Sequence, residues 1–430
     1  MALVTVENLR VEPQELRRQV AAAAAALPGT GELLNLCEDR QNFIVMFAAA
    51  LARHRTVLLP PSHAPAAVAE LRARHPGCEV VDDEFAAVIG DAPDAAAGST
   101  QAAADFVAAI GHTSGSTGVP AAHSKSLRSL ERTTALNAGV LRAELARQAE
   151  AGRPWIVATV PPQHMYGLET SVLLPLLSGF GVHAGRPLMP ADVAAALAAV
   201  PAPRVLVSTP VHLRALVESG AGYPEVAVVI SATAPLSREL AASVEGRFGA
   251  TLVEFFGSTE TCVIATRRTA HEDGWRPHPG IRLEPGEEGT TVTAPWLPRP
   301  ERLHDVVELR DDGTFVVVGR GSDFINVAGK RASLADLTRR LQSLPGVEDA
   351  VVFQPPAGGG GARRCAALVV APGRTARELL EGLRGQFDPV FLPRPLLLVP
   401  KLPRNEVGKL SRERLLEALA TSTLRPRPGK

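Results

Sequence analysis

A run of glycines and hydroxyl side chains between residues 111 and 120 is the part of the chain best suited to binding a phosphate. It reads Gly111-His112-Thr113-Ser114-Gly115-Ser116-Thr117-Gly118-Val119-Pro120. Glycine lets the backbone approach an anion closely, and hydroxyl groups donate hydrogen bonds to phosphate oxygens. The apolar residues 108–110 predict the end of a buried strand, which is where open α/β sheets bind ligands. A Walker-type P-loop does not fit this run, and taken alone it is equally consistent with a surface turn.

A second group of polar residues follows a predicted strand and reads Glu254-Phe255-Phe256-Gly257-Ser258-Thr259-Glu260-Thr261. An aromatic ring followed by Gly and Ser-Thr-Glu suits stacking on a flat base and hydrogen bonding to a phosphate. The carboxylate of Glu260 adds one hard oxygen ligand of the kind that Mg²⁺ prefers. In isolation, a strand end capped by threonine and glutamate explains the same residues equally well.

Two further positions lie nearer the C-terminus. Asp305 is followed fifteen residues later by Arg320, and a carboxylate that accepts from vicinal hydroxyls is a common way to hold a ribose. Lys409 ends a loop that begins near residue 402. Only five of the 45 basic residues are lysine, so a lysine in a loop of this chain suggests a need for a compact, titratable ammonium.

Composition restricts the classes of protein that these residues can serve. A length of 430 residues predicts two or three domains, and the formal net charge of zero argues against nucleic acid or an anionic membrane as a main partner. No signal peptide or membrane span is recognisable in the sequence. The four cysteines lie far apart, without the spacing of a zinc site or a disulfide framework. We expect a cytoplasmic protein.

The elements that must position these residues follow from the hydrophobic pattern. Residues 1–100 predict an accessory α/β layer, with a buried helix at 43–52, a strand at 56–59 and a helix at 65–75. Beyond residue 105, strands alternate with helices, which predicts a parallel sheet with crossover helices. The predicted strands are 155–160, 205–208, 226–230 and 252–256, and the predicted helices are 168–177, 191–199, 210–218 and 237–248.

The pattern changes near Asp305, where two β-rich runs flank the turn Asp312-Gly313 and predict a hairpin. A compact α+β unit of roughly a hundred residues follows. The predicted fold class is therefore α/β, with a large N-terminal domain of layered sheets and helices and a small mobile α+β C-terminal domain. The expected bounds are 1–319 for the first domain, 320–323 for a hinge, 324–423 for the second domain and 424–430 for a disordered tail.

Taken in order, these motifs resemble the adenylate-forming superfamily of acyl-CoA synthetases, non-ribosomal adenylation domains and luciferases. The resemblance covers roughly residues 36–414. It implies an ATP- and Mg²⁺-dependent enzyme in which a carboxylic acid attacks the α-phosphorus of ATP, giving an acyl-adenylate and pyrophosphate. A thiol, from coenzyme A or from the phosphopantetheine of a carrier protein, then displaces AMP.

The resemblance also assigns roles to residues of this chain. It implies that 113–118 cradle the β- and γ-phosphates and that Thr259 contacts the α-phosphate, while Glu260 holds Mg²⁺. The implied adenine and ribose contacts are Phe256 and Gly257, Ala234 on the other side of the base, Asp305 and Arg320. Lys409 is expected to bridge carboxylate and ribose oxygens, and Arg331 to be directed at phosphate.

Three departures from the family pattern concern the site. The usual Pro-Lys-Gly of the loop is Pro120-Ala121-Ala122, which leaves Lys125 as a candidate replacement. The hinge residue is either Ser322 or Asp323. The glycine that often follows Ser-Thr-Glu-Thr is replaced by Cys262, so we expect Cys262 and Val263 to narrow the acyl pocket next to His164. The alternative is that Cys262 is a small buried residue without a selective role.

The substrate and acceptor are predicted from a narrower resemblance, carried by 58–62, 161–167 and 326–334. These segments resemble stand-alone ligases of aryl-polyene and xanthomonadin-type pigment clusters, which load an aryl acid onto an acyl carrier protein. We therefore expect a hydroxybenzoate- or cinnamate-like acid and an acyl carrier protein as partners. One alternative is an acyl- or aryl-CoA ligase, and another is a catalytically silent nucleotide-binding homologue acting as a partner subunit.

Overall fold

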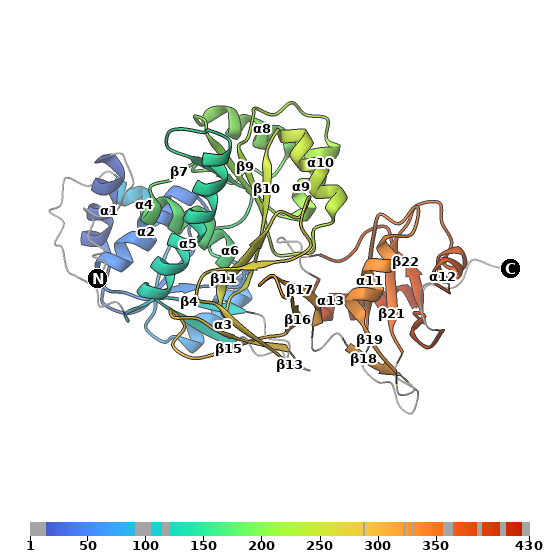
Figure 1. Cartoon of the computed structure of the whole chain (residues 1–430). Coiled ribbons are helices and arrows are strands. Elements are labelled where there is room, and N and C mark those ends of the chain that lie inside the picture. The colour runs from blue at the N-terminus through green and yellow to red at the C-terminus, as the bar shows by residue number, and fades with distance from the viewer. Residues whose placement is uncertain are drawn as a thin grey trace. The chain divides into compact units, whose positions relative to one another are not determined.

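The computed structural model describes residues 14–90, 105–113, 121–286, 289–320, 324–327, 330–355, 364–384, 389–404 and 410–423 (Figure 1). Residue contacts divide the chain into two units, the first formed by 1–281 with 294–298 and the second by 282–293 with 299–430. The mixed α/β fold class is confirmed, whereas the domain boundary expected at 319 and the hinge at 320–323 stay predictions. Across the described residues, no helix combines the length and apolar character needed to cross a bilayer.

The first unit contains a five-stranded sheet with the strand order β3-β1-β2-β4-β5. Its first four strands pair in parallel, and β5 runs antiparallel to β4. The strands are β1 (Leu33–Asn35), β2 (Val57–Leu59), β3 (Glu79–Val81), β4 (Val107–Thr113) and β5 (Ala121–Ser126). The associated helices are α1 (Gln14–Ala26), α2 (Arg40–Ala52), α3 (Pro65–Arg74) and α4 (Asp83–Gly90). The predicted strand at 56–59 and the predicted helices at 43–52 and 65–75 are confirmed.

Helix α2 lies in the core of this layer because its sequence is apolar on nearly every side. It begins after Asp39, whose side chain accepts a hydrogen bond from the Asn42 backbone N–H. Phe43 and Phe47 stack with ring centroids 6.4 Å apart and are completely buried. The helix therefore anchors the N-terminal layer against the strands.

The second sheet has seven strands in the order β12-β11-β10-β9-β8-β6-β7. Strands β7, β6, β8, β9 and β10 pair in parallel in this order, while β11 and β12 are antiparallel additions. They are β6 (Trp155–Ala158), β7 (Gly181–Val182), β8 (Arg204–Ser208), β9 (Val228–Ser231), β10 (Thr251–Ser258), β11 (Cys262–Arg267) and β12 (Arg276–Pro277). The predicted parallel sheet is confirmed at all four of its predicted strands, although the antiparallel strands were not predicted.

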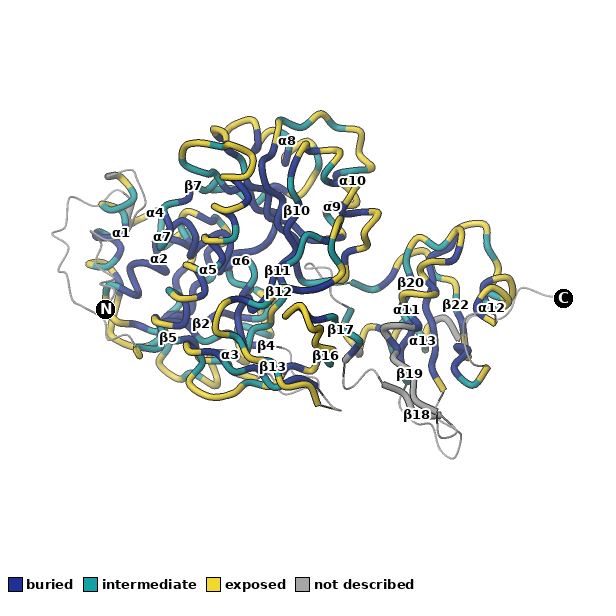
Figure 2. The backbone as a smooth tube through the Cα atoms, in the orientation of Figure 1, coloured by how far each residue is buried: buried dark blue, intermediate teal, exposed yellow. Residues whose placement is uncertain are grey.

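Crossover helices bury both faces of this sheet (Figure 2). Val205 and Val207 of β8 point into one apolar cluster, whereas Leu206 between them belongs to a cluster on the other face. The helices are α5 (Leu127–Arg147), α6 (Met165–Leu168), α7 (Leu174–Ser178), α8 (Pro190–Ala199), α9 (Pro210–Glu218) and α10 (Arg238–Phe248). A π-helical turn, η2 (Glu169–Leu173), joins α6 to α7, so the helix predicted at 168–177 is confirmed but irregular.

The second unit begins with β13 (Arg282–Gly286), β14 (Gly289–Thr293) and β15 (Glu301–Leu303), which form an antiparallel sheet. The predicted hairpin is confirmed as β16 (Asp305–Leu309) and β17 (Phe315–Arg320). Its turn contains Gly313 at φ 79°, and Thr314 N donates to Asp312 Oδ1 at 2.9 Å.

The remaining part of the second unit has the predicted α+β character. Its elements are β18 (Phe324–Val327), β19 (Lys330–Ser333), α11 (Leu334–Gln342), β20 (Asp349–Phe353), β21 (Ala366–Val370), α12 (Ala376–Arg384), a 3₁₀ turn (Pro389–Phe391), β22 (Leu396–Leu398) and α13 (Arg412–Thr423). Apolar side chains of α11 and α12 pack on the sheet β20-β21-β22 and form a core separate from the two cores of the second sheet. This unit therefore has its own hydrophobic interior.

Candidate active site

Strand β10 ends in a tight turn that carries two of the predicted catalytic residues, Thr259 and Glu260. The flanking residues close this turn, because Ser258 N donates to Thr261 Oγ1 and Thr261 N donates to Ser258 Oγ, both at 3.3 Å. Cys262 then begins β11 at φ 62°, a left-handed conformation that a residue other than glycine keeps only where its surroundings impose it. The turn thus has a defined shape.

Gly257 makes this turn possible. The register between β10 and β11 shifts there, since Phe256 faces Ala265 while Gly257 faces Val263. A Cβ atom on Gly257 would lie 2.1 Å from the carbonyl oxygen of Cys262 and 2.8 Å from the Cα of Val263. Because both of these atoms belong to the backbone, no side chain fits without a change in the turn. Gly257, predicted only as a nucleotide contact, therefore also has a structural role.

The turn packs against the β4–β5 hairpin. A Cβ atom on Gly111 of β4 would lie 2.8 Å from Thr259 Cγ2, so the missing side chain leaves room for the threonine. Lys125 of β5 donates a hydrogen bond from Nζ to the backbone carbonyl of Glu260. Two residues earlier on the same strand, His123 Nε2 lies 3.4 Å from Glu260 Oε1. The structure therefore places Glu260, the predicted magnesium ligand, against the β4–β5 hairpin. The two strands of this hairpin flank the predicted phosphate-binding run in the sequence.

Glu260 is well suited to bind a divalent cation. Burial raises the pKa of its carboxyl group, but hydrogen bonds from Ser258 and its own backbone, with the charges of His123 and Lys125, hold the pKa below its ordinary value. The side chain is 27% exposed, so an ionised oxygen remains accessible. Among the described residues no cluster of three or more metal-ligating side chains occurs.

An aromatic pair marks the predicted adenine position. The half-buried ring of Phe256 lies 5.1 Å from that of Trp275, and the guanidinium of Arg267 lies 4.2 Å above the Trp275 ring. Arg267 in turn pairs with the buried carboxylate of Glu254 at 2.7 Å. Ala234 follows β9, the parallel neighbour of β10, so Ala234 and Phe256 lie at the same edge of the sheet. The contribution of Trp275 and Arg267 was not predicted, because no spacing in the sequence links them to Phe256.

Sequence reasoning also missed a buried polar network behind the turn. Glu169 Oε1 accepts hydrogen bonds from Val263 N at 3.1 Å and from Asn137 Nδ2 at 3.4 Å. His278 Nε2 donates to Asn137 Oδ1 at 3.1 Å. Burial raises the pKa of Glu169 to about 7 and lowers that of His278 to about 4. The network links α5 and η2 to the start of β11, so it supports the turn from its buried side.

The predicted acyl-pocket residues lie at the start of α6 and in β11, two elements that contact each other. His164 is the N-cap residue of α6, and α6 packs against β11, the strand that begins with Cys262 and Val263. Both of these residues are buried. Tyr166 fixes the start of α6, because its hydroxyl donates to backbone carbonyls of β8 and β9 at 3.0 Å. The structure therefore groups the three predicted residues, while their contact with an acid stays a prediction.

The other predicted residues belong to the second unit or to undescribed segments. The half-buried Asp305 begins β16 directly opposite Arg320 at the end of β17, and Arg331 lies in β19. Thr113 is the last residue of β4, so that strand extends three residues beyond its predicted end at 110. The rest of the phosphate-binding run (Ser114, Gly115, Ser116, Thr117 and Gly118), the two hinge candidates (Ser322 and Asp323) and Lys409 lie outside the described residues, and their roles stay predictions.

The fold is that of adenylate-forming enzymes. The crystal structure of ATP-bound MatB from Rhodopseudomonas palustris matches it with a TM-score of 0.75 and 18% identity, covering 94% of this chain and 92% of that chain. The family model for AMP-binding enzymes matches residues 8–288, so the chain belongs to the AMP-binding enzyme family. Together with its relatives, this membership makes the protein an AMP-forming acid–thiol ligase.

Two relatives illustrate the range of acceptors in the family. The chain is 30% identical over 348 residues to a 4-coumarate–CoA ligase from Halorhodospira halophila, an alignment that covers 77% of this chain and 81% of that protein. It is 32% identical over 124 residues to a salicyl-AMP ligase / salicyl-S-ArCP synthetase from Mycobacterium tuberculosis, covering 28% of this chain and 22% of that protein.

Proposed function

We propose that the protein activates an aryl carboxylic acid as its acyl-adenylate and then transfers the acyl group to the phosphopantetheine thiol of an acyl carrier protein. The observation that carries this proposal is the turn between β10 and β11. Glu260 presents an ionised oxygen at the tip of this turn, and two residues later the chain enters the region predicted to line the acyl pocket. One segment would thus serve both the nucleotide and the acid.

The chemical problem is to bring a carboxylate and the α-phosphate of ATP into line although both are anions. Positioning and charge neutralisation supply most of the catalysis in such a reaction. Glu260 would hold Mg²⁺, which neutralises phosphate charge when bound. Thr259 would donate a hydrogen bond to the α-phosphate, and Phe256 would stack on the base.

The second unit would supply the remaining contacts. Asp305 would accept hydrogen bonds from the ribose hydroxyls, with Arg320 beside it, and Arg331 would be directed at phosphate. Lys409 would place its ammonium between the carboxylate and ribose oxygens, where the negative charge of both reactants is concentrated. Removing a preorganised charge contact of this kind typically lowers the rate about 10²–10³-fold.

The preference for an aryl acid has three supports. Cys262 stands where the family often has glycine, so Cys262 and Val263 would narrow the acyl pocket and leave less room for a long flexible chain. His164 and Tyr166 place aromatic rings on the neighbouring segment. The resemblance to ligases of aryl-polyene and xanthomonadin-type pigment clusters points to a hydroxybenzoate or a cinnamate.

Coenzyme A is the second candidate acceptor. The alignment with a 4-coumarate–CoA ligase, which spans 77% of this chain, favours this acceptor. The alignment with the salicyl-S-ArCP synthetase is much shorter but concerns a carrier-protein acceptor. Both acceptors use the same attacking thiol, so the adenylation step proposed above is common to them.

The test is ATP- and Mg²⁺-dependent pyrophosphate release over a panel of hydroxybenzoates, aminobenzoates, cinnamates and medium-chain fatty acids, with hydroxylamine as the surrogate nucleophile. We expect turnover on aryl acids and an approximately 10²–10³-fold loss in Lys409→Ala, with ATP binding largely retained. Turnover confined to fatty acids would contradict the aryl assignment. Absence of turnover with ATP still bound would favour the catalytically silent homologue.

Acids that react would next be offered coenzyme A and a panel of phosphopantetheinylated carrier proteins in separate reactions. Mass spectrometry distinguishes the two thioesters. A carrier-protein product formed faster than the coenzyme A thioester supports the proposal. The reverse order supports the aryl-CoA ligase.

A further inference from the structure

Strand β5 holds Glu260 through two side chains on the same face. His123 and Lys125 are two residues apart, so they point to the same side of the strand. The lysine ammonium bonds to the main chain of Glu260, and the histidine ring faces its carboxylate oxygen at 3.4 Å. The two contacts therefore fix different parts of one residue, its backbone and the orientation of its carboxylate.

The burial of Lys125 requires an explanation. The residue is only 3% exposed, although lysine is rarely buried unless it is paired. The charge of the Lys125 ammonium acts to lower the pKa of two carboxyl groups, that of Glu260 in the turn and that of Glu169 behind it. Arginine supplies nearly all other basic charge in this chain, with five lysines among 45 basic residues. An ammonium is more compact than a guanidinium, and here it donates to a single carbonyl oxygen.

The partner strand completes the support. Gly111 of β4 is paired with His123 in the hairpin register, and it is the residue that packs against Thr259. The β4–β5 hairpin thus contacts the turn at Thr259, at the Glu260 backbone and at the Glu260 carboxylate. Groups that hydrogen-bond to a metal ligand and fix its orientation typically change metal affinity 10- to 100-fold when they are removed.

We propose that His123 and Lys125 are positioning residues that set the geometry of Glu260 for the divalent cation bound with ATP. Neither residue is assigned contact with the substrate. The inference rests on the proposed function for the identity of the cation and nucleotide. It adds that the hairpin, and not only the turn itself, determines how strongly Mg²⁺ and ATP bind together.

The test measures binding without turnover. The affinity of the full-length protein for ATP is determined by isothermal titration calorimetry with Mg²⁺ and again with EDTA, in the absence of any acid. The dissociation constant for ATP measured in EDTA divided by that measured in Mg²⁺ is the coupling ratio. It is large when the cation and the nucleotide strengthen each other's binding. We expect Lys125→Met to reduce this ratio about 10- to 100-fold and to change the affinity measured in EDTA less than about threefold.

Arg128→Met is the matched control. Arg128 lies three residues further along, its side chain is 59% exposed, and it lies 3.4 Å from Asp105 rather than near Glu260. The substitution removes the same charge, so an effect of net charge alone would appear in both variants. We expect His123→Gln to reduce the ratio less than Lys125→Met does, because it removes only the contact with the carboxylate.

Thermal unfolding of each variant separates positioning from folding. A Lys125→Met protein that melts at a lower temperature but keeps the coupling ratio of Arg128→Met would overturn the proposal, and so would a ratio that rises. A wild-type protein without any coupling would overturn it as well. If the wild-type protein shows coupling between Mg²⁺ and ATP but forms no adenylate with any acid, this inference stands and the proposed function fails.

Discussion

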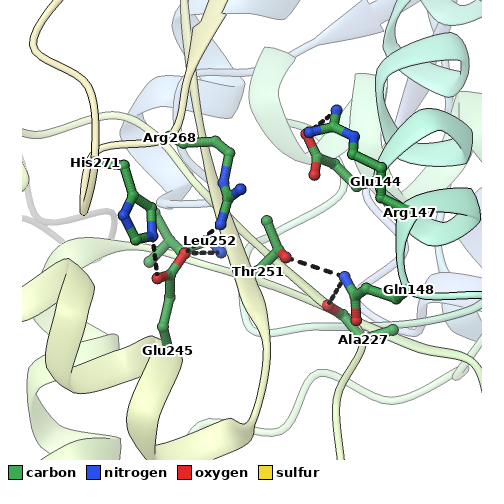
Figure 3. A network of polar contacts seen from close by, with 9 residues as sticks. All are labelled: Glu144, Arg147, Gln148, Ala227, Glu245, Thr251, Leu252, Arg268 and His271. Atoms are coloured by element: carbon green, nitrogen blue, oxygen red, sulfur yellow. Dashed lines mark hydrogen bonds and ion pairs between the residues drawn. The ribbon is translucent and has the colours of Figure 1, made fainter.

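The two ends of strand β10 carry polar structures of opposite kinds. At its amino end, Glu245 of α10 accepts a hydrogen bond from Leu252 N at 2.9 Å, lies 2.9 Å from His271 and 3.6 Å from Arg268 (Figure 3). At its carboxyl end, Glu260 is oriented by His123 but keeps an accessible oxygen. One carboxylate has its partners within the protein, and the other is held in place with room for a ligand.

The same contrast holds for the neighbouring groups. Near the amino end, Gln148 Nε2 donates to Ala227 O and to Thr251 Oγ1, both at 3.0 Å, which ties α5 to β9 and β10 (Figure 3). At the carboxyl end, the hydrogen bonds of Ser258 and Thr261 close the turn on itself. Polar contacts at the first end join elements of the fold, whereas those at the second shape the turn and hold it against β5 and η2. We therefore expect substitutions at the amino end to change stability and substitutions at the carboxyl end to change activity.

The largest effect is expected for Gly257→Ala. The added Cβ atom would lie 2.1 Å from a backbone oxygen, so the turn must shift and move Glu260. A displacement of about 1 Å in a catalytic site can lower the rate about 10²-fold, which we expect in kcat for pyrophosphate release. Gly246→Ala in α10 is the control, because nothing lies within 4 Å of its added Cβ. The control should be about 0.5–1 kcal/mol more stable, with unchanged kcat.

Glu169→Gln tests the network behind the turn through the pH dependence of stability. Folding raises the pKa of Glu169 from 4.5 to about 7. Between these pH values, Glu169 is protonated in the folded protein but ionised in the unfolded chain. The contribution of Glu169 to stability is therefore present below pH 4.5 and is lost as pH rises to about 7. The glutamine variant lacks this loss, so its melting temperature should rise relative to that of the wild type between pH 5 and pH 7.

The opposite shift of His278 does not obscure this measurement. Its pKa is lowered from 6.5 to about 4, so its contribution is present above pH 6.5 and is lost as pH falls through about 4. Since both proteins contain His278, its effect cancels in the difference between their melting temperatures. A difference that stays constant from pH 5 to pH 8 would contradict the assignment to Glu169.

Glu245→Ala tests the amino end of β10. The variant leaves Leu252 N without its carboxylate partner and removes the contacts of that carboxylate with Arg268 and His271, so the free energy of unfolding should fall by about 1–3 kcal/mol. Chemical denaturation measures the loss, and kcat at 25 °C should remain within about twofold of the wild type. A large fall in kcat without a fall in stability would remove the distinction between the two ends.

The smallest effect is expected for Thr251→Val. The substitution keeps the β-branched shape but removes the hydroxyl that accepts from Gln148, whose amide retains Ala227 O as a partner. Loss of one neutral hydrogen bond lowers the free energy of unfolding by about 0.5–1.5 kcal/mol. Activity should not change, and pyrophosphate release under saturating substrates checks this.

The parts of the fold that sequence reasoning predicted are those with local causes. Helix α9 was predicted with its observed bounds because Pro210 begins it and its apolar residues repeat with helical spacing. Helix α10 was predicted from its hydrophobic pattern, and in the structure Ser237 caps it and Gly249 ends it at φ 64°. The parallel strands were recognised as short runs of valine, leucine and isoleucine.

The parts that were not predicted depend on contacts between distant segments. Lys125 and Glu260 are 135 residues apart, and no pattern in either segment indicates that the ammonium meets a backbone carbonyl. The same reason applies to Glu169, which lies 94 residues from Val263. Lys125 was a candidate to replace the missing loop lysine, which stays a prediction because 114–120 lie outside the described residues; the structure shows its ammonium on the Glu260 carbonyl. The scarcity of lysine identified the residue as unusual but not its partner.

The burial of the cysteines bears on the proposed second half-reaction, in which a thiol consumes a reactive acyl-adenylate. Burial, aided by the carboxylate of Glu169, raises the pKa of Cys262 to about 12, and burial raises that of Cys365 to about 11. At pH 7 the Cys262 thiol is therefore protonated, whereas the thiolate is the form that attacks an acyl group. A buried, protonated thiol at Cys262 would not compete with the acceptor for the activated acid.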